Sequence, residues 1–155
     1  MISRRRQEGF TYLEMIITIT ILLVLVAAAI PVARLSIKRQ KELELRTALR
    51  RMRDAIDLYK KYSEQGLVPQ EGIQSEGYPP DLDTLVEGVN QVGAIDKKIR
   101  FLRRIPKDPM TNDFDWGLRS LQDDPNSTTW GRENVFDVYS QSEATALDGT
   151  TYNTW

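Results

Sequence analysis

The chain has 155 residues, of which 28% are charged and 41% hydrophobic, and its formal net charge is -1; this length is enough for one modest domain. It contains no Cys and no His, which excludes disulfides, thiolate or imidazole metal sites and a Ser-His-Asp triad. A near-neutral charge also argues against nucleic acid as a partner, because nucleic-acid binders carry a strongly basic surface.

The N-terminal part of the chain combines a basic leader with a long apolar run. Residues 1–9 include Arg4, Arg5 and Arg6 and a single acid. The run from Met15 to Ala33 has no charged residue, and as a helix it is ~28 Å long, close to the ~30 Å hydrocarbon core of a membrane. It predicts a membrane-inserted helix with a cytoplasmic N-terminus, because positive charge favours that side. Four basic residues beyond the run oppose this orientation: Arg34, Lys38, Arg39 and Lys41.

Three interpretations of the apolar run are open. The first is an ordinary signal anchor. The second is a cleavable secretory signal with a cleavage site in residues 27–29, although the run is longer than the ~7–15 apolar residues of such a signal. The third starts from Gly9 and Glu14, which precede the run. A carboxylate inside a membrane costs about 3 kcal/mol, so a simple anchor gives no reason for Glu14.

Cleavage after Gly9 would give Glu14 a partner. It would remove the leader arginines and expose the amine of Phe10 as a new positive terminus. Phe10 and Glu14 are spaced i, i+4, which predicts that they share one helical face. The pair would be easier to bury than either charge alone, within one chain or between neighbouring chains. The alternative is that Glu14 lies at the depth of the lipid headgroups.

This segment resembles the N-terminal signature of type IV pilins and pseudopilins. Residues 9–14 read Gly-Phe-Thr-Tyr-Leu-Glu and lead into the apolar helix, whereas the usual signature is Gly-Phe-Thr-Leu-Ile-Glu. The resemblance implies that an inner-membrane prepilin peptidase cleaves after Gly9, that Phe10 is N-methylated and that Glu14 acts in filament assembly. It also places Pro31 where the family has a helix-kinking proline, which makes Pro31 a second candidate assembly residue.

An amphipathic stretch follows the apolar run. Residues 34–63 are rich in charge and contain no Gly or Pro. Apolar side chains recur every three or four positions, which predicts a helix with one apolar face: Leu45, Ala48, Leu49, Met52, Ala55, Ile56, Tyr59 and Tyr62. Gly66 predicts its end, so one helix from Phe10 to Ser63 would be ~80 Å long. The stripe is short for a coiled coil, and we expect it to face a globular head.

The remaining residues predict short elements. A helix is expected from Leu82 to about Gly88. Residues 95–102 form either a short helix or an extended stretch, with three inward-facing side chains: Ile99, Leu102 and Ile105. Strands are expected within 114–121 and 134–140, separated by a turn at 123–127. The predicted fold is therefore α+β, a long N-terminal helix whose amphipathic half is packed by a small antiparallel sheet. The predicted parts are a leader (1–9), a membrane and polymerisation segment (10–33) and a periplasmic head (34–155).

The head resembles the major pseudopilin of type II secretion systems. The similar segments are Gly77–Pro80, Arg104–Pro109 and Asp137–Ser140, and the chain departs from the family where Met110 and Thr111 stand in place of Trp-Gly. The resemblance implies a subunit that polymerises into a pseudopilus driving type II protein secretion. The implied partners are copies of the chain, minor pseudopilins, the prepilin peptidase, an inner-membrane assembly platform and a cytoplasmic assembly ATPase. The implied location is the inner membrane, crossed once, with a periplasmic head, and then a periplasmic or surface filament.

Calcium is the cofactor that the resemblance implies. Major pseudopilins of that branch hold Ca²⁺ in the loop after the last strand, which here covers residues 140–149. Calcium takes about six to eight oxygen ligands, and the candidate carboxylates are Glu143, Asp148 and the nearby Asp137. The alternative for this loop is a solvated turn containing Asp148 and Gly149.

Two other functions compete with the secretion filament. One is a type IV pilus pilin, major or minor, with the same anchor. The other, less favoured, is a signal-anchored periplasmic binding module that does not polymerise. Catalysis is not expected, because the sequence has no Gly-rich phosphate loop and its acid pairs, such as Asp81 and Asp83, lie in turn-like contexts.

Overall fold

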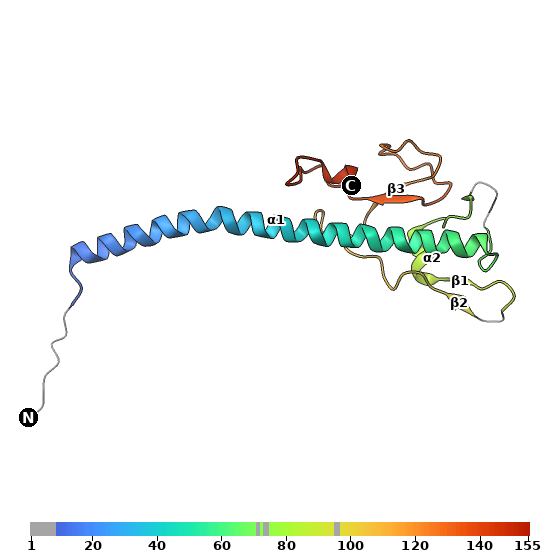
Figure 1. Ribbon diagram of the computed structural model, residues 1–155, viewed down its shortest axis with the longest axis horizontal. Helices are drawn as coiled ribbons and strands as arrows, with labels where there is room; N and C mark the ends of the chain where they lie inside the picture. The colour runs from blue at the N-terminus through green and yellow to red at the C-terminus, as the bar shows by residue number, and fades with distance from the viewer. Residues whose placement is uncertain (1–8, 71, 73–74, 95–96) are drawn as a thin grey trace, which may run out of the picture. The chain divides into compact units, whose positions relative to one another are not determined.

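The computed structural model describes residues 9–70, 72, 75–94 and 97–155 (Figure 1). The leader arginines and the pair Ile95 and Asp96 lie outside the described residues. The chain divides into two compact units, residues 1–39 and 40–155. The first unit contributes the apolar part of a helix and the second forms the head, and each is considered by itself below.

The long helix α1 spans Tyr12–Glu64 and has 53 residues. Its end is a Schellman motif, in which the N–H of Leu67 donates to the carbonyl of Tyr62 at 3.0 Å and the N–H of Gly66 donates to Ser63 at 2.9 Å. Gly66 has a φ of 68°, a left-handed conformation that glycine adopts without strain. The predicted helix and its predicted glycine cap are confirmed.

The head begins with a short helix, α2, at Leu82–Glu87. Asp81 caps it, since its carboxylate accepts the backbone N–H of Thr84 at 2.7 Å. Gly88 follows with a φ of 79°. Local capping chemistry therefore sets both ends of α2, and its bounds agree with the helix expected from Leu82 to about Gly88.

Two small antiparallel ribbons complete the head, in place of a single sheet. β1 (Val89–Asn90) pairs with β2 (Lys98–Ile99), with Val89 opposite Ile99. The extended alternative for this region is thus the right one. β3 (Gly117–Arg119) pairs with β4 (Asp137–Tyr139), with Leu118 opposite Val138. A short 3-10 helix, η2, covers Tyr152–Thr154.

β3 and β4 are shorter than predicted, because side chains replace the strand ladder at one end. Asn134 holds the two chain segments together there. Its side-chain oxygen accepts the N–H of Leu121 at 3.0 Å, and its carbonyl accepts the hydroxyl of Ser120 at 3.0 Å. These bonds keep the segments side by side while ending the regular backbone pairing.

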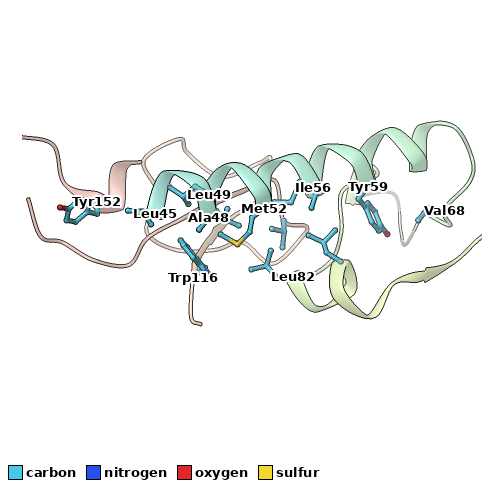
Figure 2. Packing of buried hydrophobic residues seen from close by; sticks show 14 of the residues in the cluster. Leu45, Ala48, Leu49, Met52, Ile56, Tyr59, Val68, Leu82, Trp116 and Tyr152 are labelled. Carbon is cyan, nitrogen blue, oxygen red and sulfur yellow. The ribbon is translucent and has the colours of Figure 1, made fainter. Parts of the chain in front are cut away.

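The core of the head lies along the apolar face of α1 (Figure 2). All of the predicted stripe residues from Leu45 to Tyr59 are buried, and Tyr62 is partly buried. Figure 2 shows Tyr152 near Leu45 at one end of this row and Val68 near Tyr59 at the other. The buried side chains that cover the face come from the rest of the head: Val68, Leu82, Leu85, Trp116, Val135, Val138, Ala146 and Tyr152. The predicted α+β architecture is confirmed.

The β3–β4 ribbon departs from simple alternation of buried apolar and exposed polar residues. Arg119 is buried, with 8% of its surface exposed. Its guanidinium lies 4.0 Å from the centre of the Tyr139 ring, 3.6 Å from the carboxylate of Asp137, and its Nε donates to Ser127 at 2.8 Å. A buried arginine is stable when its donors and its charge are matched in this way.

Candidate membrane-insertion and assembly site

The apolar part of α1 is bare in the first compact unit. α1 is the one helix among the described residues that is long and apolar enough to cross a membrane. The large apolar side chains from Met15 to Val32 are exposed, and even Ile16 is 45% exposed. A continuous apolar surface of this size is unfavourable in water and marks a surface that lipid or protein covers.

The polar groups inside the apolar run are satisfied within the helix. The hydroxyl of Thr18 donates to the carbonyl of Met15 at 2.9 Å, and that of Thr20 donates to Ile16 at 2.7 Å. Backbone acceptors one turn earlier therefore take up both hydroxyls. Neither hydroxyl therefore opposes an apolar environment.

The start of α1 differs from the prediction. Thr11 caps the helix, because its hydroxyl oxygen accepts the N–H of Glu14 at 3.3 Å and its carbonyl accepts the N–H of Met15 at 3.1 Å. Phe10 precedes this cap, is outside the helix and is 77% exposed. The expectation that Phe10 and Glu14 share one helical face concerns the cleaved chain and stays a prediction, whereas in the uncleaved chain Phe10 lies before the first helical residue, Tyr12. The capping threonine competes for the turn in which such a pair would form.

Glu14 occupies the first turn of α1 and is exposed. Its carboxylate forms no ion pair with any residue that the structure describes. The partial positive charge at a helix N-terminus favours an acid at this position. The helix dipole thus stabilises the carboxylate of Glu14, which can still form an ion pair with a cation of another chain.

The predicted processing position is open. Gly9 lies outside the helix and is exposed, and a Cβ added to it would meet no atom within 4 Å. Among the residues that the structure describes, no steric feature therefore requires glycine at this position. Pro31 lies inside α1, which continues on both sides of it; the missing N–H of proline leaves one helical hydrogen bond unmade at that point.

Two of the three predicted calcium ligands, Asp137 and Asp148, are bonded to other protein groups, and the third, Glu143, lies elsewhere. The carboxylate of Asp137 accepts a hydrogen bond from Nε of Arg53 at 2.6 Å and forms an ion pair with Nη1 of Arg119 at 3.6 Å. Asp148 accepts the hydroxyl and N–H of Thr150, at 2.6 and 3.0 Å, and lies 3.5 Å from a guanidinium nitrogen of Arg46.

Because of these bonds, Asp137 and Asp148 would have to give up protein partners to bind a metal ion. Hydrogen bonds from Thr150, and then the charge of Arg46, lower the pKa of Asp148. Within the described ranges, no three acidic side chains converge so that they could hold a metal ion. Asp137, Glu143 and Asp148 therefore do not fit a calcium ion in this arrangement.

Glu143 instead lies at a separate hollow beside the β3–β4 ribbon. The hollow has a volume of about 460 Å³ and is also lined by Asp115, Trp130 and Asn153. Both acids are exposed at its mouth. The buried side-chain oxygen of Asn153 accepts no hydrogen bond from the residues that the structure describes.

Sequence reasoning missed three polar residues that organise the head. Glu42 is 8% exposed and accepts two hydrogen bonds from the C-terminal segment, and Arg53 donates to two positions in β4 and to the carbonyl of Trp155. Asp108 is fully buried, accepting the hydroxyl of Ser140 at 2.6 Å and the N–H of Met110 at 2.7 Å. Glu42 carried a signal, since it stands three positions before Leu45 and so continues the buried stripe.

The fold and the bare helix together define the class of protein. A long N-terminal helix, apolar and exposed in one part and packed by small antiparallel ribbons in the other, is a pilin-like α+β architecture. The family model described as "Prokaryotic N-terminal methylation motif" matches residues 4–30. The matched residues include Gly9, Phe10 and Glu14.

One comparison extends beyond the N-terminal helix. The chain is similar to the type II secretion system core protein G of Escherichia coli (strain K12), with 26% identity over 109 residues and 70% of each chain covered. No solved structure gives a significant match. An alignment of 109 residues is longer than α1, so this similarity includes part of the head.

Proposed function

We propose that this chain is a filament subunit, made as a prepilin-like precursor, that polymerises into a pseudopilus of a type II secretion system. The observation that carries the proposal is the bare apolar run of α1, which directly follows Glu14 and of which residues 15–30 lie within the methylation-motif match. In this account a prepilin peptidase cleaves after Gly9 and the new amine of Phe10 is methylated. The chain rests in the inner membrane, crossed once, with its head in the periplasm, until it enters the filament.

Helix-to-helix contact replaces lipid contact in the filament. The exposed apolar surface from Met15 to Val32 would be covered by the same surface of neighbouring copies. Because both environments are apolar, the exchange changes the free energy little, and packing and charge decide the preference. A head-to-tail contact that does not close into a ring repeats as a helical filament.

The charges at the start of α1 favour pairing between chains. Glu14 lies in the first helical turn, where the helix dipole stabilises a carboxylate. The same dipole opposes the positive amine that cleavage would create at Phe10. That amine therefore gains most from an additional carboxylate, which the Glu14 of a neighbouring copy can supply. Assembly would then pair the positive amine of Phe10, which has no favourable partner in a single chain, with the Glu14 carboxylate of a neighbour.

The similarity to the E. coli protein supports the secretion filament over a type IV pilus. The methylation motif alone fits a pilin of either system, major or minor. The 26% identity, however, covers 70% of both chains and so includes part of the head as well as the helix. The partners in this account are minor pseudopilins, an inner-membrane assembly platform and a cytoplasmic assembly ATPase. Nucleic acid is not among the proposed partners.

Deletion and complementation test the proposal. Cells lacking this chain are expected to lose export of folded proteins into the medium, and the wild-type gene is expected to restore it. Because the chain contains no Cys, cysteines placed at Ile16 and Ile30 would give oxidised multimers only through contacts between copies. A ladder of multimers supports polymerisation. Normal export without the chain would contradict the secretion role, and long surface pili that depend on it would favour the pilus.

A further inference from the structure

The segment that follows β4 is fastened to the first turns of the head's part of α1. In Figure 1 this C-terminal segment, residues 144–155, runs beside the helix. It closes on itself through a bridge between Thr145 and Thr151 and ends in η2. We call it the C-terminal strap. Its attachment to α1 depends mainly on Glu42 and Arg53.

Glu42 holds the strap at two points. Its Oε1 accepts the N–H of Leu147 at 2.8 Å and the hydroxyl of Tyr152 at 2.9 Å. The carboxylate belongs to a residue that is 8% exposed, and Tyr152 is 2% exposed. A buried carboxylate is strongly unfavourable unless donors surround it. These two bonds therefore link the position of the strap directly to the burial of Glu42.

Arg53 holds the strap and β4 together. Its Nε donates to Asp137 at 2.6 Å, and its Nη2 donates to the carbonyls of Val138 and Trp155 at 3.1 and 2.9 Å. One planar guanidinium thus joins α1, β4 and the end of the strap, an arrangement that lysine cannot reproduce. Arg46 adds a further contact, with its guanidinium carbon 4.3 Å from the centre of the Trp155 ring.

These contacts occupy the place that a cation would need. A divalent ion at Asp137 would have to displace Arg53 and would lie beside Arg119, and an ion at Asp148 would lie beside Arg46. Like charges at such distances repel strongly beside Asp137 and Arg119, where water is partly excluded, and more weakly at the exposed Asp148. Asp137 is thus matched by the guanidinium groups of Arg53 and Arg119, and Asp148 by Arg46 and by hydrogen bonds from Thr150.

We propose that the C-terminal strap is fastened to α1 by Glu42 and Arg53 without a metal ion, so that the head folds and keeps its structure in the absence of calcium. In a head that calcium holds together, acids of the last loop would converge on the ion. Here Glu42 and Arg53 hold the strap to α1, and Arg46 adds a contact to Trp155. The inference concerns the folding of a single chain and does not depend on filament assembly.

Thermal unfolding of the full-length chain in detergent tests the proposal. All three tryptophans of the chain, Trp116, Trp130 and Trp155, lie in the head, so tryptophan fluorescence reports head unfolding and not the apolar helix. The wild-type Tm is expected to be the same in calcium and in chelator. Glu42→Leu and Arg53→Met are expected to lower the Tm equally in both. The matched controls are Glu44→Leu and Arg50→Met, at exposed positions of the same helix, which should leave it unchanged.

Hydrogen exchange gives a local readout that general destabilisation would not produce. Tyr152→Phe is a mild variant that keeps the fold, and it is expected to speed exchange in residues 144–155 more than in α2. A wild-type Tm that rises with calcium and falls in chelator would overturn the proposal. If Glu143→Gln also abolished that rise, the ion would lie in the hollow of Asp115, Glu143 and Asn153. The proposal would also be overturned if Glu42→Leu and Arg53→Met changed the Tm no more than the control substitutions do.

Discussion

The hydroxyl oxygen of Thr11 accepts the backbone N–H of Glu14 at 3.3 Å, so α1 begins at Tyr12, after the predicted cleavage position. Cleavage after Gly9 would therefore leave Phe10 and Thr11 ahead of the helix, with the new amine outside the regular turns. The amine would then be free to meet a carboxylate of another chain. This relationship makes the N-terminal residues a separate recognition element from the apolar helix that follows them.

Gly9→Ala is expected to block processing without disturbing the fold. The added Cβ meets no atom within 4 Å, so the substitution acts only on recognition by the peptidase. The mobility of the chain on gels and its intact mass measure the result, and the Tm of the head, followed by tryptophan fluorescence, serves as the control. Normal maturation of the variant would contradict a cleavage site at this glycine.

Glu14→Leu is expected to abolish assembly while leaving the chain in the membrane. Removing the carboxylate lowers the cost of membrane insertion by about 3 kcal/mol, but it also removes the partner of the Phe10 amine. Membrane fractionation and cross-linking of multimers separate the two effects. Thr18→Val, one turn further along, is the matched control, because that hydroxyl is satisfied inside the helix. Wild-type levels of filament from the leucine variant would refute charge pairing.

Tyr152→Phe is expected to make the free energy of unfolding of the head less sensitive to alkaline pH than it is in the wild type. Burial, and then the hydrogen bond to Glu42, raise the pKa of Tyr152 from 10.0 to about 12. The folded chain thus holds this proton more tightly than the unfolded chain does. The stabilisation is complete below pH 10 and is lost as the pH rises from 10 towards 12.

The variant should therefore be less stable near pH 7, by about 1 kcal/mol for the lost hydrogen bond, and should lose less stability between pH 10 and 12. Denaturant unfolding followed by tryptophan fluorescence at several pH values measures both effects. Identical alkaline slopes for the two chains would show that Tyr152 is not the group that titrates.

Gly117→Ala is expected to destabilise the β3–β4 ribbon. A Cβ at this position would lie 2.2 Å from the ring of Tyr139, so the ring would have to move and would disturb its stacking with Arg119. Overpacking of this kind typically costs about 1–3 kcal/mol. Tyr139→Leu in the same chain should recover part of that loss. A Tm equal to that of the wild type would show that the ribbon adapts without strain.

Local signals in the sequence predict most of the fold. The apolar stripe of α1, the Gly66 cap and the Asp81 cap each depend on residues within a few positions of one another, and each is found in the structure. Even the missed start of α1 had a local signal, because Thr11 and Glu14 have the spacing of a capping box. The ends of β3 and β4 were less predictable, since Asn134 interrupts their ladder through its side chain.

The missed parts of the site depend on distant partners. Glu42 bonds a residue 110 positions away and Arg53 bonds residues 84 to 102 positions away. The spacing of Glu42 indicates burial and Arg53 has the pattern of an ordinary surface charge, but the bonding partners of both residues are seen only in the folded head. For the same reason the sequence does not indicate that Asp137 and Asp148 are neutralised, because the arginines that neutralise them come from α1 and β3.

The intact mass of the chain isolated from cell membranes tests the central claim most directly. The account predicts a chain that begins at Phe10 and carries one methyl group on its terminal amine. A chain that retains Met1 and the leader arginines would show a simple anchor, and a chain that begins near Ile30 would show a secreted protein. Either of these masses would contradict the assignment of this chain as a processed filament subunit.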